Sequence, residues 1–358
     1  MKLGITGKAK SGKTTLFNTI TGQNADINLY DTKLEPNLGM VQVPDERIDH
    51  LSEIYKPKKT IYANIEFLDF PPMIKDNESH EFLSPTSMAL LKNTDAVAIV
   101  LRNFTNTILD ETQGKANPSS ELNDIMLEFI YSDILIAEKR LEKIELNFKR
   151  GVKDATALME EKTLRKCLEY LHKEIHIRDI DLAEDELRTI KGFQFLSLKP
   201  IMIILNSDEN NFGKNQDIVS ELAKISSVHE FAGKFEYELS SLPSEEALAF
   251  MEDIGIKESA VKRTIKTSYD LLGYISFFTV GDDEVRAWTI QKGDNALVSA
   301  GKIHSDLARG FIRAETFTYE DIIKYGSERA IREKGLFRLE GKTYIVQDGD
   351  IIFVRFNV

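Results

Sequence analysis

The stretch Gly7-Lys8-Ala9-Lys10-Ser11-Gly12-Lys13-Thr14 decides the fold, because it matches the phosphate-loop pattern G-x-x-x-x-G-K-[ST]. An apolar strand expected at 2–6 precedes it and a helix expected at 13–22 follows, which is the context that the motif requires. Glycines let the loop curl so that its N–H groups face phosphates, and the helix N-terminus adds a favourable dipole. The sequence therefore predicts a nucleotide-phosphate site over residues 7–15.

Each polar side chain of this loop has an expected task. Lys13 is expected to reach the β- and γ-phosphates and to stabilise transition-state charge, while the Thr14 hydroxyl binds Mg²⁺. Thr15 continues the helix start that faces the phosphates. Lys8 and Lys10 add positive charge, and the pattern leaves open whether they hold phosphate or are simply solvated.

The rest of the chain alternates short apolar strands with helical patterns. Such alternation is typical of an α/β fold with a mostly parallel sheet. After the first strand, further strands are expected at 39–43, 62–69, 95–101, 199–206 and 234–240. Helices are expected at 45–55, 80–93, 214–226, 243–253 and 257–272.

Two long amphipathic segments interrupt this alternation. Residues 119–149 and 154–178 carry apolar stripes at helical spacing, and a turn at 150–152 separates them. They predict an antiparallel helical arm inserted in the α/β domain. The stripes are interpreted as a core-forming seam. The expected domains are 1–118 with 196–273 for the nucleotide domain, 119–195 for the arm, and a compact mixed α/β module over 274–358.

Composition excludes several classes of protein. The 358 residues include 46 Lys and Arg against 58 Asp and Glu, a net charge of −12, so bulk-charge coating of nucleic acid and sequence-specific DNA binding are not expected. The single cysteine, Cys167, excludes an internal disulfide and any zinc site built on several thiolates. Neither a membrane-length apolar run nor a signal-peptide pattern is found, so the expectation is a cytoplasmic protein without a membrane partner.

Further candidates for the site lie at the ends of the expected strands. Asp69 ends one strand as a Mg²⁺-coordinating aspartate does, acting through water, although a turn aspartate also fits. Asn206 and Glu209 stand where a GTPase carries Asn-Lys-x-Asp. Glu209 is one methylene longer than that aspartate, so strong guanine selection is not expected. Ser240 and Ser241 either back the base with main-chain amides or cap the next helix.

These motifs and their order resemble the YchF family, Obg-related P-loop NTPases of the translation-factor class. The resemblance spans the chain and rests on the phosphate loop and on five further segments, Leu34–Gly39, Asn206–Glu209, Glu284–Ile290, Gly310–Glu315 and Val346–Asp350. It implies a GTPase-like domain, a helical arm and a C-terminal β-grasp module of the TGS type. It also implies ribosome association and hydrolysis of ATP in preference to GTP.

The chain departs from the family pattern in the second switch. The family's Asp-x-x-Gly becomes Asp69-Phe70-Pro71-Pro72, and Pro72 has no N–H to offer the γ-phosphate. The stretch from there to Asp95 is glycine-rich in the family and contains no glycine here. Met73 follows, consistent with a family that lacks the catalytic glutamine of other GTPases.

The first switch and the region near residue 110 also differ. The threonine that completes the Mg²⁺ shell in the family aligns with Lys33. Two candidates result: Thr32 as the ligand after a one-residue register shift, or Lys33 as a cation beside the γ-phosphate. The histidine that the family uses near the phosphates has no counterpart in residues 108–112.

Three functions remain open from the sequence. The first is a YchF-like ATPase with rewired switches, whose hydrolysis is slow because preorganised donors are lost. The second is a nucleotide-binding protein that docks on the ribosome with little or no hydrolysis. The third is a P-loop kinase of small molecules, against which the TGS-like C-terminal module and the lack of an arginine-bearing lid argue.

Overall fold

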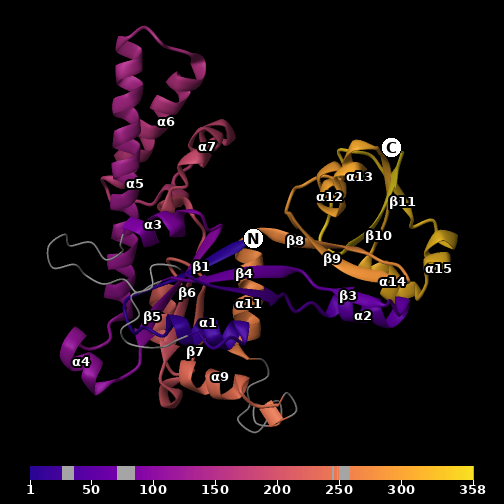
Figure 1. Cartoon of the computed structure of the whole chain (residues 1–358), viewed down its shortest axis with the longest axis horizontal. Helices are drawn as coiled ribbons and strands as arrows, with labels where there is room; N and C mark the ends of the chain where they lie inside the picture. The colour runs from indigo at the N-terminus through magenta and orange to yellow at the C-terminus, as the bar shows by residue number, and fades with distance from the viewer. Residues whose placement is uncertain (26–35, 71–84, 244–245, 248, 250–258, 358) are drawn as a thin grey trace. The chain divides into compact units, whose positions relative to one another are not determined.

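The computed structural model describes residues 1–25, 36–70, 85–243, 246–247, 249 and 259–357 (Figure 1). The chain divides into two compact units. The first joins Met1–Gly39 to Glu66–Arg263, and the second joins Met40–Ile65 to Thr264–Val358.

The first unit is built on a six-stranded sheet in the order β2-β4-β1-β5-β6-β7. Its strands are β1 (Lys2–Thr6), β2 (Asn37–Gln42), β4 (Asn64–Asp69), β5 (Ala96–Asn103), β6 (Ile201–Ser207) and β7 (Val228–Phe231). β1 runs parallel to β4 and β5, and β6 runs parallel to β5 and β7. The predicted α/β fold with a mainly parallel sheet is therefore confirmed.

Helices cover this sheet and explain its apolar strands. They include α1 (Lys13–Thr21), α3 (Pro85–Lys92), α8 (Gln216–Leu222) and α9 (Gly233–Ser240), and the short helix α4 (Thr107–Gln113) follows β5. Val97, Ile99 and Leu101 of β5 pack in one cluster with apolar residues of α3 and of the arm helix α5. Burial on both faces explains why β5 reads as a continuous apolar run.

The arm consists of α5 (Pro118–Lys149) and α6 (Ala155–Leu171), which lie side by side in Figure 1, followed by α7 (Glu184–Ile190). The predicted seam is a packed core that includes Leu141, Ile144 and Leu164. Cys167 is fully buried in it, and burial raises the pKa of its thiol to about 11. It is therefore a packed thiol. The second helix is shorter than predicted, because the chain turns through a left-handed Glu174 with φ of 59°.

The second unit holds a second six-stranded sheet in the order β11-β10-β12-β8-β9-β3. Its strands are β3 (Lys59–Ile61), β8 (Tyr274–Thr279), β9 (Glu284–Gln291), β10 (Phe311–Thr318), β11 (Arg338–Glu340) and β12 (Asp350–Phe356). Its helices are α2 (Glu46–Tyr55), α11 (Ala260–Leu271), α12 (Ala296–Ile303), α13 (Ser305–Arg309), α14 (Tyr319–Tyr325) and α15 (Glu328–Glu333). The predicted C-terminal mixed α/β module is present.

The segment 40–65 belongs to the second compact unit, although its sequence pattern continues the nucleotide domain. β3 pairs in parallel with β9 from Lys59 to Ile61. The Arg47 guanidinium lies 2.8 Å from an Asp348 carboxylate oxygen and covers the Phe278 ring at 5.2 Å. The compact unit also begins at Thr264 rather than at 274. The predicted domain boundaries thus differ from the packing and stay a prediction.

One predicted strand is wrong. Residues 234–240 alternate apolar and polar, which is typical of a strand, yet Gly233–Ser240 forms helix α9. Its buried residues are Gly233, Glu236 and Leu239, three residues apart as a helix face requires. The strand is the four-residue β7 just before it. The helix predicted at 243–253 lies mostly outside the described residues.

Asp133 of α5 anchors the arm to the sheet domain. It is fully buried, and its two oxygens accept hydrogen bonds from the backbone N–H groups of Leu196 (3.0 Å) and Ser197 (2.7 Å). Those two residues begin the turn that leads into β6. The carboxylate therefore caps a buried turn, since Leu196 and Ser197 are themselves fully buried.

Replacing Asp133 by Ala should leave the backbone N–H groups of Leu196 and Ser197 without an acceptor. We expect this to lower the free energy of unfolding by about 2–4 kcal/mol, since an unpaired buried N–H costs about 1–3 kcal/mol. Urea unfolding followed by far-UV circular dichroism measures this. Asp133→Asn keeps one acceptor oxygen and should lose roughly half as much. An Ala variant as stable as the wild type would contradict this role.

Candidate nucleotide site

The phosphate loop connects β1 to α1 and depends on two glycines. Gly7 and Gly12 have φ of 149° and 102°, in the region that favours glycine. A Cβ on Gly7 would lie 2.4 Å from the Val100 carbonyl oxygen, and one on Gly12 would lie 2.1 Å from the Asn206 amide nitrogen. Gly12 is also the N-cap of α1, with no side-chain cap among the described residues. The N–H groups of the first turn are thus available to an anion.

Lys13 carries a buried positive charge within the loop. Its ammonium donates hydrogen bonds to the backbone oxygens of Gly7 (3.0 Å) and Lys8 (2.9 Å). Burial lowers the pKa of Lys13 to about 8, although the negative charges of Asp69 and Glu121 oppose the change. The loop therefore holds a cation whose partners are mainly neutral oxygens, a setting in which an anionic phosphate would be favoured.

Thr14 and Asp69 meet beside Lys13. The Thr14 hydroxyl donates to Asp69 Oδ2 at 2.8 Å, and the Asn37 amide donates to the same oxygen at 3.2 Å. Asp69 Oδ1 is buried and has no hydrogen-bond partner among the described residues. Burial raises the pKa of Asp69, while the Thr14 hydrogen bond and the Lys13 charge act against the rise. A hydroxyl and a carboxylate with a spare oxygen form a donor set that suits Mg²⁺.

Asn206, at the end of β6, braces the phosphate loop through a hydrogen bond to its backbone. Its amide NH₂ donates to the Ser11 carbonyl oxygen at 2.9 Å, and its carbonyl oxygen accepts from Gly233 N at 3.1 Å. The loop is thereby joined to the start of α9. Sequence reasoning missed Gly233, because β7 is short and the strand was expected further along the chain.

Three further residues, Glu209, Ser240 and Ser241, were predicted to contact the nucleotide base. Glu209 is exposed in the short turn after β6, on the same chain end as Asn206. Ser240 is the last residue of helix α9 and Ser241 is its C-cap, where a strand was expected to end. Both hydroxyls donate to the Tyr237 carbonyl oxygen. They lie a helix length, about 10 Å, from the Gly233 end. The strand that was expected to precede them is therefore wrong, and their contact with a base stays a prediction.

The other predicted residues of the loop line its surface. Lys8, Ala9 and Thr15 are half-buried, Ser11 is buried, and Lys10 is exposed with a left-handed φ of 63°. Thr32, Lys33, Pro72 and Met73 lie outside the described residues. Their predicted roles stay predictions.

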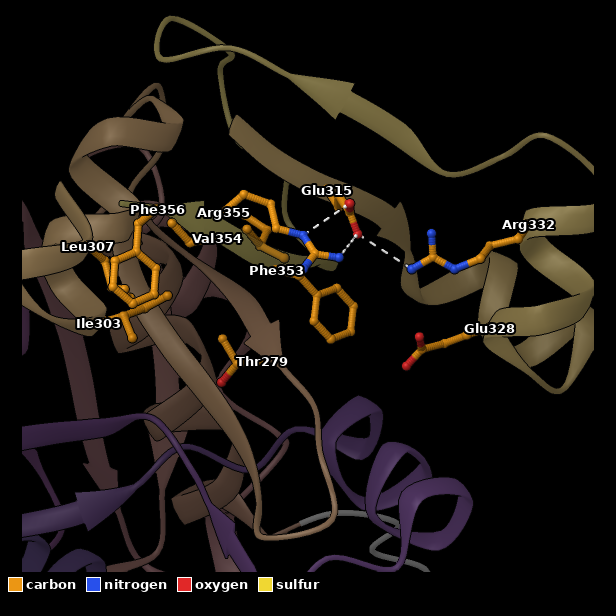
Figure 2. Close-up of a pocket in the computed structure, with 11 residues that line it drawn as sticks. Thr279, Ile303, Leu307, Glu315, Glu328, Arg332, Phe353, Val354, Arg355 and Phe356 are labelled. Carbon is orange, nitrogen blue, oxygen red and sulfur yellow. Dashed lines mark hydrogen bonds and ion pairs between the residues drawn. The ribbon is translucent and has the colours of Figure 1, made fainter. Parts of the chain in front are cut away.

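A separate hollow of about 490 Å³ lies in the C-terminal unit (Figure 2). Figure 2 shows Arg355 and Arg332 both turned toward Glu315. Arg355 Nε lies 3.1 Å from Glu315 Oε1, and Arg332 Nη2 lies 3.4 Å from Oε2. Hydrogen bonding to Arg355 lowers the pKa of Glu315. The last residue of the Gly310–Glu315 motif thus links β10, β12 and α15, and no predicted nucleotide residue lines this hollow.

Full-length relatives identify the family. A Pasteurella multocida protein named "Ribosome-binding ATPase YchF" is 39% identical over 362 residues, which cover 100% of this chain and 99% of that protein. A Bacillus subtilis protein of the same name is 38% identical over 99% of both chains. The chain belongs to the YchF family. The solved structure of the Schizosaccharomyces pombe YchF GTPase superposes with a TM-score of 0.85 at 29% identity, covering 99% of this chain and 97% of that one.

Two protein families match separate parts of this YchF chain, one at the phosphate loop and one at the C-terminal module. Residues 2–139 match a family described as "50S ribosome-binding GTPase", and residues 274–357 match YchF-GTPase_C, described as a "Protein of unknown function". Both the P-loop fold and the YchF-type C-terminal module are therefore confirmed. Within the described residues, no helix is long and apolar enough to cross a membrane.

Removing the Asn206 brace should loosen the loop of this YchF chain. Asn206→Ala loses both hydrogen bonds, and we expect nucleotide affinity to fall about tenfold, since one internal hydrogen bond contributes about 0.5–1.5 kcal/mol and about 1.4 kcal/mol is a factor of ten. Isothermal titration measures the change. Asn206→Asp, which still accepts from Gly233 but cannot donate to Ser11, separates the two bonds. Affinity that is unchanged in both variants would contradict the brace.

The pKa of Lys13 predicts a pH dependence of binding. A phosphate beside the ammonium raises this pKa, so binding is favoured below about pH 8 and weakens as the pH rises through the value of the free loop. Affinity at pH 9 should be about tenfold lower than at pH 7. Titrations near pH 8.5 in two buffers of different ionisation enthalpy should report net proton uptake. A flat affinity between pH 7 and 9 would contradict the prediction.

Proposed function

We propose that this chain is a ribosome-binding ATPase that binds Mg²⁺-ATP at residues 7–15 and hydrolyses it slowly. One observation carries the proposal: the buried Lys13 ammonium rests on loop carbonyls at 2.9 and 3.0 Å, next to Thr14 and Asp69. A buried cation whose hydrogen bonds go to neutral oxygens gains from an anionic ligand. The loop therefore supports phosphate binding.

In the proposed complex, Lys13 leaves the Gly7 and Lys8 oxygens for the β- and γ-phosphates. The Thr14 hydroxyl and Asp69, the latter through water, hold Mg²⁺. Bound Mg²⁺ neutralises charge on the phosphate oxygens. Asn37 keeps Asp69 oriented by its amide hydrogen bond at 3.2 Å.

The base-side residues support a preference for ATP over GTP. Asn206 is hydrogen-bonded to Ser11 and Gly233, so it fixes the phosphate loop rather than selecting a base. Glu209 is exposed and longer than the aspartate that grips the guanine edge in GTPases. Without the aspartate that binds the guanine edge, GTP has no additional contact that would make it bind more tightly than ATP.

Slow hydrolysis follows from the second switch. Pro72 cannot donate an N–H to the γ-phosphate, and the histidine near position 110 is missing. Losing one preorganised donor costs about 10²–10³ in rate. In the proposal, part of the lost transition-state stabilisation is replaced, either by Thr32 as a Mg²⁺ ligand or by Lys33 as a cation beside the γ-phosphate. The alternative, a ribosome-interaction protein with little or no hydrolysis, is favoured by the same Pro72.

Ribosome binding rests on the relatives. Two full-length relatives carry the name ribosome-binding ATPase, and residues 2–139 match a 50S ribosome-binding GTPase family. Similarity over the whole chain supports the same partner here. The proposed location is the cytoplasm, where ribosomes and nucleotides are available.

The test is a titration and a rate measurement on the purified chain. We expect ATP to bind more tightly than GTP, and turnover to be about 10²-fold or more below that of a YchF relative with the usual second switch. Lys13→Ala should abolish binding, and ribosomes should co-sediment with the wild-type chain. Turnover as fast as the relative's, abolished by Lys13→Ala, would refute slow hydrolysis; failure to bind either nucleotide would refute the proposal.

A further inference from the structure

The phosphate loop is tied to the helical arm by an ion pair. The Lys8 ammonium lies 2.7 Å from Asp124 Oδ2, across 116 residues of sequence. Asp124 stands in the second turn of α5, the long helix of the arm. Both side chains are partly shielded, with 27% and 34% of their surfaces exposed, so solvent weakens the pair only in part.

Lys8 also takes part in the loop's internal structure. Its backbone oxygen accepts from the Lys13 ammonium at 2.9 Å and from Ser11 N at 3.3 Å. One residue therefore contacts the arm through its side chain and supports the phosphate-binding cation through its backbone. A displacement of the Lys8 backbone would change the position from which Lys13 reaches a phosphate.

The base of α5 is fixed well enough to act as an anchor. Glu121, three residues before Asp124 on the same helix face, accepts from the backbone N–H of Arg102 at 3.4 Å. The Arg102 guanidinium is 3% exposed and lies 3.1 Å from Asp110. β5, which ends in this region, pairs with β1, from which the loop begins. Asp124 is thus held in a defined place relative to the loop.

We propose that Asp124 is a positioning residue for nucleotide binding, acting through Lys8 on the loop backbone. The inference rests on the proposed function, since it concerns the same site. Coupling between two sites is reciprocal. Nucleotide binding therefore stabilises the first turns of α5, and an arm partner that breaks the ion pair weakens nucleotide binding.

A simple charge effect makes a different prediction. If Asp124 and Lys8 act only through their fields on the phosphates, removing the carboxylate strengthens binding and removing the ammonium weakens it. If they act as a positioning pair, removing either one weakens binding. The two explanations therefore differ in the sign of the Asp124 effect.

The experiment is a double-mutant cycle on the full-length chain. The probe is Mg²⁺ with β,γ-imido-ATP, titrated by calorimetry into the wild type, Asp124→Asn, Lys8→Met and the double variant. Each single change should weaken binding about three- to tenfold, and the double change by no more than the larger single one, because contacting residues couple. Asp124→Glu, which keeps the charge, should recover most of the affinity.

Glu142→Gln is the matched control, because it removes the same charge from the exposed face of α5 about 27 Å further along the helix. It should leave the affinity unchanged, and circular dichroism checks that every variant is folded. Hydrogen exchange adds a readout that a merely structural role would not move. Nucleotide should slow exchange at residues 119–126 in the wild type and not in Asp124→Asn.

Several outcomes would overturn the inference alone. They are tighter binding by Asp124→Asn, effects of the two single changes that multiply in the double variant, or wild-type binding that neither change alters. A wild-type chain that binds neither the ATP analogue nor its GTP counterpart overturns the proposed function and this inference with it. The wild-type titration therefore separates the two failures.

Discussion

A buried ammonium, that of Lys13, is the constraint on which the rest of the site depends. A charge removed from water must be compensated or it destabilises the fold. Here two loop carbonyls accept from it, which requires the tight curl that the left-handed Gly7 and Gly12 permit. The curl leaves the Ser11 carbonyl oxygen in need of a donor, which Asn206 supplies. The buried Lys13 charge is therefore stabilised by several groups together. The two glycines allow the curl, Asn206 satisfies the loop, and the Asp69 carboxylate lies nearby.

The metal-side residues stand on strands that lead into the second compact unit. Asn37 begins β2 and Asp69 ends β4, and the chain between them includes the segment 40–65. That segment is held in the second unit by the β3–β9 pairing and by Arg47. Only two residues, Leu38 and Gly39, separate Asn37 from Met40. Asn37 and Asp69 are therefore close in sequence to a segment that belongs to the second compact unit.

The sequence predicted the local parts of this structure and missed the distant pairings. The phosphate loop was predictable because strand, glycines and helix are adjacent in the chain, and the arm because its stripes extend over many turns. Residues 234–240 misled because a short amphipathic helix with aromatic residues at alternate positions imitates a strand. Neither the three-residue β3 nor the Lys8–Asp124 pair leaves a local pattern, since their partners lie more than 100 residues away.

Binding and hydrolysis draw on different groups in this chain. The groups that bind phosphate and metal in the proposed function are Lys13, Thr14 and Asp69, and each has a built position. In the proposed function, the groups that sense the γ-phosphate belong to the switch segments, where the family resemblance aligns Pro72 with a donor glycine. A lost donor in the transition state lowers the rate while ground-state binding persists. In the proposed function, nucleotide binding therefore does not depend on the groups whose loss slows hydrolysis.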